Sequence, residues 1–150
     1  MTLPSLTGPL TGMHDGLLTS VAVSEGAAVL GLTHVDGRQF NLTLTGVEAL
    51  SINDFREGNI ILELQVATGS DFEVVGLSPG DVRATLEVLF ARPHSEAAQK
   101  YHDDYDAALD RHVERLEKGE MRLVILDPAY GADLVAYCAS AELADVAPPA

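Results

Sequence analysis

The pair His14-Asp15 is the first group of residues in the chain whose types could do chemistry. An imidazole beside a carboxylate suits acid–base catalysis, and both groups ligate metals. A metal site needs at least three donors, however, and no matching second set accompanies this pair. The favoured interpretation is structural, with His14 or Asp15 bonded to the backbone of a turn, and no metal or other cofactor is expected.

The segment Asn53-Asp54-Phe55-Arg56-Glu57-Gly58-Asn59 is dense in polar groups between two apolar stretches. Loops held by a rigid sheet often carry function, so this loop is a candidate binding site. The alternative is a structured turn, in which Asn53 and Asp54 bond the local backbone, Gly58 supplies a positive φ and Arg56 pairs with a carboxylate. The turn is the favoured interpretation, because Asn, Asp and Gly are the residues that such turns need.

A third candidate is an acidic tract made of His102, Asp103, Asp104, Asp106, Asp110 and His112. His102 and Asp106 are four residues apart and share a helix face, which is compatible with a cation site. An electrostatic docking face is favoured over a metal site, because several carboxylates stack along one side of a helix. The carboxylates expected to form it are Asp103, Asp106, Asp110, Glu114 and Glu117.

The charge of the chain limits its partners. Nine Lys and Arg face 23 Asp and Glu in 150 residues, which gives a formal net charge of −14. Such a surface repels nucleic acid and anionic membranes, and it attracts a basic protein or a cation. The competing interpretation is that the charge serves solubility alone. The single cysteine, Cys138, and the absence of a signal-like N-terminus favour the cytoplasm.

The elements that must position these residues follow from the hydrophobic period. Apolar residues alternate with polar ones through most of the first two thirds, and short turns such as Asp36-Gly37 favour antiparallel pairing. Strands are predicted at 17–24, 28–32, 39–45, 47–52, 60–66, 72–77, 121–126 and 134–143, with a turn at 127–131.

Two helices are predicted between the strand blocks. Ser78 caps the first, with Pro79 in its first turn and Asp81 completing a capping box, and Pro93 stops it. Ser95 is expected to cap the second, which Gly119 terminates. The prediction is a single α+β domain over 1–143, an antiparallel sheet of about six to eight strands with two inserted helices, and a frayed tail over 144–150.

Three segments also carry a resemblance: His14-Asp15-Gly16, the run from Asn53 to Ile61, and Asp127-Pro128-Ala129-Tyr130-Gly131-Ala132. Together they resemble a family of small bacterial proteins of unknown function, some of which are similar to predicted immunity proteins of polymorphic toxin systems. The resemblance implies a basic toxin domain as partner and assigns no catalytic residue. In that setting Phe55 or Tyr130 would be the anchors that supply affinity.

The function predicted from the sequence is therefore non-enzymatic binding of a protein partner, with neutralisation of a toxin as its specific form. The alternative is a metal-dependent or acid–base enzyme that uses His14, Asp15 and the 53–59 loop. A third hypothesis is a homodimer built through an exposed strand edge.

Overall fold

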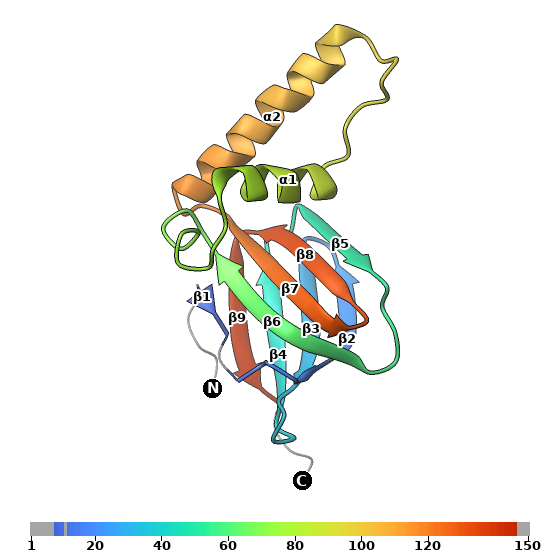
Figure 1. Cartoon of the computed structure of the whole chain (residues 1–150), viewed down its shortest axis with the longest axis vertical. Helices are drawn as coiled ribbons and strands as arrows, with labels where there is room; N and C mark the ends of the chain where they lie inside the picture. The colour runs from blue at the N-terminus through green and yellow to red at the C-terminus, as the bar shows by residue number, and fades with distance from the viewer. Residues whose placement is uncertain (1–7, 11, 147–150) are drawn as a thin grey trace.

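The computed structural model describes residues 8–10 and 12–146, and within them the chain forms nine strands and two helices (Figure 1). The predicted class, α+β with an antiparallel sheet and two helices inserted between strand blocks, is confirmed. In chain order the elements are β1 (Gly8–Pro9), β2 (Leu17–Ser24), β3 (Ala27–Thr33), β4 (Gln39–Thr45), β5 (Ala49–Asn53), β6 (Asn59–Ala67), α1 (Pro79–Leu89), α2 (Gln99–Glu117), β7 (Arg122–Tyr130), β8 (Asp133–Cys138) and β9 (Ser140–Asp145).

The sheet closes on itself. Its strand order is β5-β8-β7-β6-β2-β3-β4-β9, with β1 beside β6. Only residues 46–48 separate β4 from β5, and only Ala139 separates β8 from β9. The β4–β9 ladder at one end of the order therefore continues around a corner as the β5–β8 ladder at the other end. We call this closed arrangement the strand ring.

The corner of the strand ring depends on Gly46. Its φ is +61°, and a Cβ added there would lie 2.7 Å from the Cβ of Ala139. The Ala139 amide donates to the Thr45 carbonyl at 3.0 Å, which keeps the two bent strands paired at the bend. A glycine fits because it adopts a positive φ without strain and leaves room for the facing strand.

Alternation along each strand divides the apolar residues between two cores. Leu134 and Ala136 of β8 pack inside the strand ring, whereas Val135 and Tyr137 face outward. The inner core is almost entirely aliphatic, and its largest fully buried side chains include Leu18, Leu30, Leu32, Leu42, Leu44, Ile61 and Leu64. The outer core lies between the helices and the outer face of β7 and β8.

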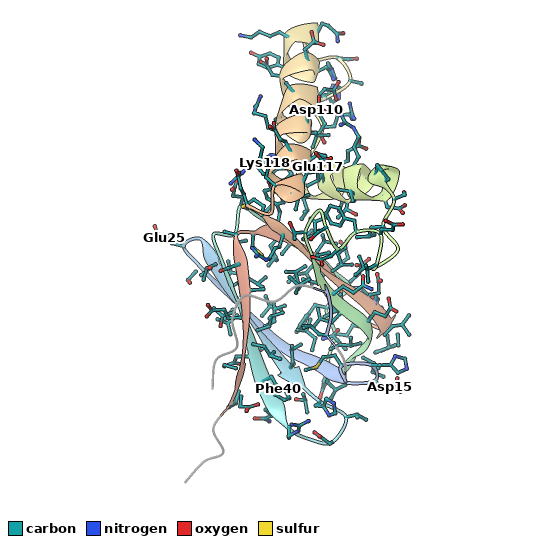
Figure 2. The ribbon with its side chains drawn as sticks, turned by 90° about the vertical axis from the view of Figure 1, so that its left-hand side faces the viewer. Asp15, Glu25, Phe40, Asp110, Glu117 and Lys118 are labelled. Carbon is teal, nitrogen blue, oxygen red and sulfur yellow. The ribbon has the colours of Figure 1, made fainter. Side chains whose placement is uncertain are left out.

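Helix α1 lies across one end of the outer face, and α2 extends away from the sheet (Figures 1 and 2). The predicted capping box of α1 is confirmed, since the Ser78 hydroxyl accepts from the Asp81 amide and the Asp81 carboxylate accepts from the Ser78 amide. Leu109 and Leu116 anchor α2 in the outer core, while Tyr101 near its start is exposed. No helix in the described ranges has the length and apolar character needed to cross a membrane.

Some element boundaries differ from the predictions. Residues 72–77 form turns and not a strand, because Phe72 and Leu77 turn toward the outer core and Gly76 adopts a φ of +78°. Ser95 does not cap α2, which begins at Gln99 after Ala98 without a side-chain cap.

The C-terminal strands also differ. The predicted turn at 127–131 is wrong for most of its length, because β7 stays paired with β6 as far as Tyr130. The single strand expected at 134–143 divides at Ala139, where the chain bends from β8 into β9. The expected tail begins inside β9, whose last residue is Asp145, and residues 147–150 lie outside the described residues.

Candidate functional site: an acidic cleft beside helix α1

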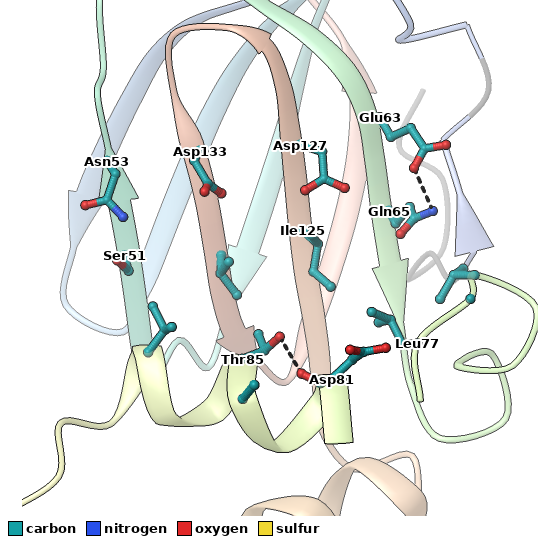
Figure 3. A pocket seen from close by; sticks show the side chains of 15 residues that line it. Ser51, Asn53, Glu63, Gln65, Leu77, Asp81, Thr85, Ile125, Asp127 and Asp133 are labelled. Atoms are coloured by element: carbon teal, nitrogen blue, oxygen red, sulfur yellow. Dashed lines mark hydrogen bonds between the residues drawn. The ribbon is translucent and has the colours of Figure 1, made fainter. Parts of the chain in front are cut away.

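A cleft of about 560 Å³ opens between α1 and the outer face of β5, β8, β7 and β6 (Figure 3). It has a polar border and a floor that is apolar at its centre, and we call it the acidic cleft. None of its lining residues is Lys, Arg or His. They are Ser51, Asn53, Glu63, Gln65, Val75, Gly76, Leu77, Asp81, Ala84, Thr85, Val88, Ile125, Asp127, Asp133 and Val135.

The polar border is a row of side chains set by strand register. Asn53 pairs with Asp133, and Glu63 pairs with Asp127. The register of β7 with β8, in which Leu126 pairs with Leu134, places Asp127 next to Asp133, as Figure 3 shows. Three carboxylates, those of Glu63, Asp127 and Asp133, thus lie side by side on neighbouring strands, and we call them the acidic row.

The acidic row lacks compensating charge. Among the described residues, no hydrogen bond or ion pair reaches the carboxylates of Asp127 and Asp133. Glu63 accepts one long hydrogen bond within the described part of the chain, 3.4 Å from the amide nitrogen of Gln65. Like charges directly opposite one another in a sheet are destabilising, so the row costs stability in this state.

The floor of the cleft is the next row of the same four strands. Its members are Ser51, Val135, Ile125 and Gln65, each two residues from a member of the border row on its own strand. Side chains two apart in a strand face the same side, so strand periodicity places the two apolar residues of the floor, Ile125 and Val135, directly beside Asp127 and Asp133. One residue pair further, Tyr137 and Leu123 lie in the outer core against the helices.

The electrostatics of the cleft differ between its carboxyl groups. Partial burial, together with the charges of Asp133 and Glu63, raises the pKa of Asp127 above its usual range. In contrast, the backbone amide and hydroxyl of Ser78 hydrogen-bond the Asp81 carboxylate and lower its pKa. Asp81 is held in the cap of α1, whereas no hydrogen bond or ion pair within residues 8–10 and 12–146 stabilises the charge of Asp127.

Gln65 adds a neutral acceptor to the floor. The residue is 9% exposed, and its amide nitrogen is directed at Glu63. Its amide oxygen has no hydrogen-bond donor among the described residues and points away from Glu63 into the cleft (Figure 3). This oxygen is not among the buried polar atoms that lack a partner, so it is accessible from the cleft and available to a donor from a ligand.

The structure places His14 and Asp15 outside the acidic cleft. The Nδ1 atom of His14 lies 2.8 Å from the Leu62 carbonyl oxygen, and its Nε2 atom lies 3.6 Å from the Asp15 carboxylate. His14 lines a neighbouring hollow with Leu62 and Val74. β8 and β7 separate β5, which carries Asn53, from β6 beside His14, about 14 Å at ordinary strand spacing. The far end of the loop, Asn59, is closer, since the Asp15 amide donates to the carbonyl of Ile61 two residues further along β6. The side chains nevertheless line different hollows: His14 lines one, Asn53 the acidic cleft, and Phe55 a third.

The 53–59 loop is a structured turn, as the favoured interpretation predicted. Asp54 and Gly58 have positive φ, and Arg56 pairs with Asp54 at 2.8 Å. The expected backbone bonds of Asn53 and Asp54 are wrong for the described residues, because the side chain that bonds the backbone is that of Asn59, which is 1% exposed. Its side chain accepts from the amides of Arg56 and Ala132 and donates to the carbonyls of Arg56 and Leu18.

The two predicted anchors, Phe55 in this loop and Tyr130 at the end of β7, lie at the surface. Phe55 and Tyr130 are each 49% exposed. The guanidinium of Arg56 lies 5.7 Å from the centre of the Tyr130 ring, so the structure brings the loop and the end of β7 together. Phe55 and Arg56 line a shallow hollow with Leu17 and Thr19, separate from the acidic cleft.

The acidic face predicted on α2 is partly neutralised by the protein itself. Arg83 of α1 lies 2.8 Å from Asp110 and 3.7 Å from Asp106, and Arg92 lies 3.6 Å from Asp106. Asp103 accepts from Gln99 one turn earlier. The described residues contain no group of three or more His, Cys, Asp or Glu side chains arranged to hold a metal ion.

Sequence reasoning missed the acidic row, although a signal for it exists. In two strands a carboxylate stands two residues from an apolar residue on the same face, Asp127 from Ile125 and Asp133 from Val135. In the third strand, Glu63 stands two residues from Gln65, which is polar. Their alignment depends on register, which the sequence alone does not give. No family model, curated protein or solved structure matches the chain.

Proposed function

We propose that the protein is a non-enzymatic binding module that docks a basic protein partner through the acidic cleft. The observation that carries the proposal is the acidic row: Glu63, Asp127 and Asp133 lie on neighbouring strands with no cation paired to them among the described residues. A sheet surface that only needed solubility would gain nothing from placing like charges opposite one another.

A cationic group in the cleft offsets this repulsion. It interacts with several carboxylates at once, in a cleft whose floor excludes part of the solvent. The partner would therefore supply a Lys or Arg side chain to the acidic row, and apolar contacts to Ile125 and Val135 would add affinity.

The net negative charge of the whole protein favours fast association with such a partner. With a formal net charge of −14, the protein attracts basic surfaces over a range set by ionic strength. The α2 carboxylates contribute to this long-range field, although Asp106 and Asp110 are paired with arginines. Steering of this kind raises the association rate more than the final affinity.

The specific form of the proposal is neutralisation of a basic toxin domain in the cytoplasm, as the resemblance of three segments implies. Nucleic-acid-acting toxins carry cationic clefts, and an acidic protein that occupies such a cleft blocks it. The single cysteine, Cys138, is buried and unpaired, which suits a reducing compartment.

The test compares three forms of the protein in affinity capture from a lysate of the native organism, at low and at moderate salt. The cleft variant carries Glu63→Gln, Asp127→Asn and Asp133→Asn. The control carries Glu25→Gln, Asp104→Asn and Glu142→Gln, which remove the same charge at exposed positions away from the cleft. Mass spectrometry identifies what each form retains.

We expect one basic protein to be retained stoichiometrically by the wild type and the control, and to be lost from the cleft variant. Retention that all three forms share would contradict docking at the cleft. If the control and the cleft variant retain the captured protein equally poorly, the interaction depends on net charge alone, and a specific site at the cleft is excluded.

A further inference from the structure

We infer that the group bound by the acidic cleft is the guanidinium of an arginine side chain on the partner. This inference rests on the proposed function and specifies its ligand. It is drawn from the number and arrangement of acceptors in the cleft and from the apolar surfaces that flank them.

The acceptors form a set that a guanidinium can satisfy. Asp127 and Asp133 present carboxylates on adjacent strands, which lie about 4.8 Å apart. The amide oxygen of Gln65 adds a neutral acceptor on the floor. A guanidinium carries five N–H donors in one rigid plane and bonds carboxylates through two donors at a time, whereas an ammonium has three donors around a point charge.

The walls of the cleft also favour the guanidinium. Ile125, which is 9% exposed, and Val135 form the floor beside the acidic row. Ala84 and Val88 of α1 line the same cleft. The flat faces of a guanidinium are weakly hydrated and its stem is aliphatic, so both can lie against such surfaces. An ammonium is more strongly hydrated and loses more on leaving water.

The charges of the cleft carboxylates are also compatible with an arginine as the bound group. The acidic row carries up to three negative charges, and partial burial together with the charges of Asp133 and Glu63 raises the pKa of Asp127. Asp81 lies in the same cleft and keeps its charge through the cap of α1. One arginine therefore leaves the cleft net negative, which permits a second basic residue of the same segment to lie at the border.

The experiment is a titration followed by two-dimensional NMR of the ¹⁵N-labelled full chain, at low salt and neutral pH. The probes are acetyl-arginine amide and acetyl-lysine amide, which have the same net charge, the same two amide groups and no other charged group. We expect the arginine probe to shift the amide signals of Ile125, Asp127 and Asp133, with an affinity at least several-fold above that of the lysine probe.

Two variants locate the effect. Asp127→Asn with Asp133→Asn should weaken the arginine probe by about tenfold or more, because charge-assisted hydrogen bonds are lost. Gln65→Leu tests the neutral acceptor and should reduce the preference for arginine over lysine. The control Glu25→Gln with Asp104→Asn should leave both affinities within about twofold. The spectra also report whether each variant is folded.

Each outcome decides the inference. A preference for the arginine probe that disappears in the Asp127→Asn, Asp133→Asn variant supports the inference. Equal affinities of the two probes overturn guanidinium recognition, while a basic partner captured only by the intact cleft would still support the proposed function. NMR shifts confined to residues outside the acidic cleft overturn the inference. The proposed function is overturned separately, if the captured partner binds equally well when the cleft carboxylates are replaced.

Discussion

Asp127 on β7 faces Glu63 on β6 as its direct antiparallel partner, so two carboxylates of like charge are neighbours on one face of the sheet. Asp133 lies on the other side of Asp127. The pKa of Asp127 is raised by partial burial and by these two charges. The arrangement costs stability that a bound cation would restore.

Asp127→Asn should stabilise the protein. Since the pKa of Asp127 is higher in the fold than in the unfolded chain, its contribution to stability is present at low pH and is lost as the pH rises through the raised pKa. We expect the free energy of unfolding of the variant at pH 7 to exceed that of the wild type. The gain is only a few tenths of a kcal/mol, because solvent screens this exposed group.

Urea denaturation at pH 7 and pH 3 measures the difference, which should vanish at pH 3. Asp104→Asn, an exposed aspartate outside the cleft, is the control; an equal gain there would assign the effect to net charge.

Gly131→Ala should destabilise the turn between β7 and β8. Gly131 has a φ of +85°, and an added Cβ would lie 2.5 Å from Oδ1 of Asn59. That side chain satisfies buried backbone groups, so displacing it adds the cost of lost hydrogen bonds to the cost of the strained φ, in total about 2–4 kcal/mol. Gly37→Ala is the matched control, because its φ is +91° but nothing lies within 4 Å of the added Cβ. Thermal denaturation should show a cost at Gly37 of only about 1–2 kcal/mol; equal losses would disprove the role of Asn59.

Ser78→Ala should weaken α1 and the cleft beside it. The substitution removes the hydroxyl that caps the Asp81 amide, at a cost of about 1 kcal/mol. Ser95 provides a control, since the sequence predicted it as a cap and the structure does not use it as one. Chemical denaturation should show a change within a few tenths of a kcal/mol for Ser95→Ala. A comparable loss at both positions would contradict the observed start of α2.

The protein should lose stability in alkali. Burial raises the pKa of the Cys138 thiol to about 11 and that of the Tyr137 phenol to about 12. Both groups are neutral when they stabilise the fold, so their contribution is complete below about pH 9 and is lost between about pH 9 and 12. Denaturant titrations from pH 8 to pH 11 measure this decline.

Cys138 provides a direct check on the same point. Because the side chain is fully buried and its thiol pKa is raised, Ellman's reagent at pH 8 should not react with it until denaturant unfolds the chain. Cys138→Ala should reduce the loss of stability between pH 9 and 11, and it serves as the blank for labelling. Rapid labelling of the native protein would show that the corner between β8 and β9 opens readily.

Much of the fold could be predicted because local patterns and the final structure agree. Leu42 and Leu44 alternate with polar residues and lie inside the sheet, and Ser78 with Asp81 forms the capping box that their spacing predicted. The strand predicted at 72–77 was wrong, because Phe72 and Leu77 pack in the outer core beside the helices and do not pair with another strand. Apolar content alone does not distinguish a packed turn from a short strand.

The site was harder to predict because its parts are ordinary in isolation. Asn53 was singled out and lines the acidic cleft, but its neighbours in space, Asp133 and Asp127, are distant in sequence. Their meeting depends on three strand registers at once. The α2 carboxylates were predicted as a free acidic face because the positions of Arg83 and Arg92 relative to α2 are a property of helix packing.

The bent β8–β9 strand closes the strand ring, and this has a consequence for synthesis. Leu42 of β4 pairs with Leu143 of β9, so the partner of an early strand is translated after every other strand of the ring. While the ribosome has yet to release residues 140–145, the nascent chain has an unpaired β4 edge and an uncovered inner core. Such edges are templates for wrong pairing, and contacts this distant in sequence form slowly. Chaperone dependence during translation should therefore be greatest just before β9 emerges.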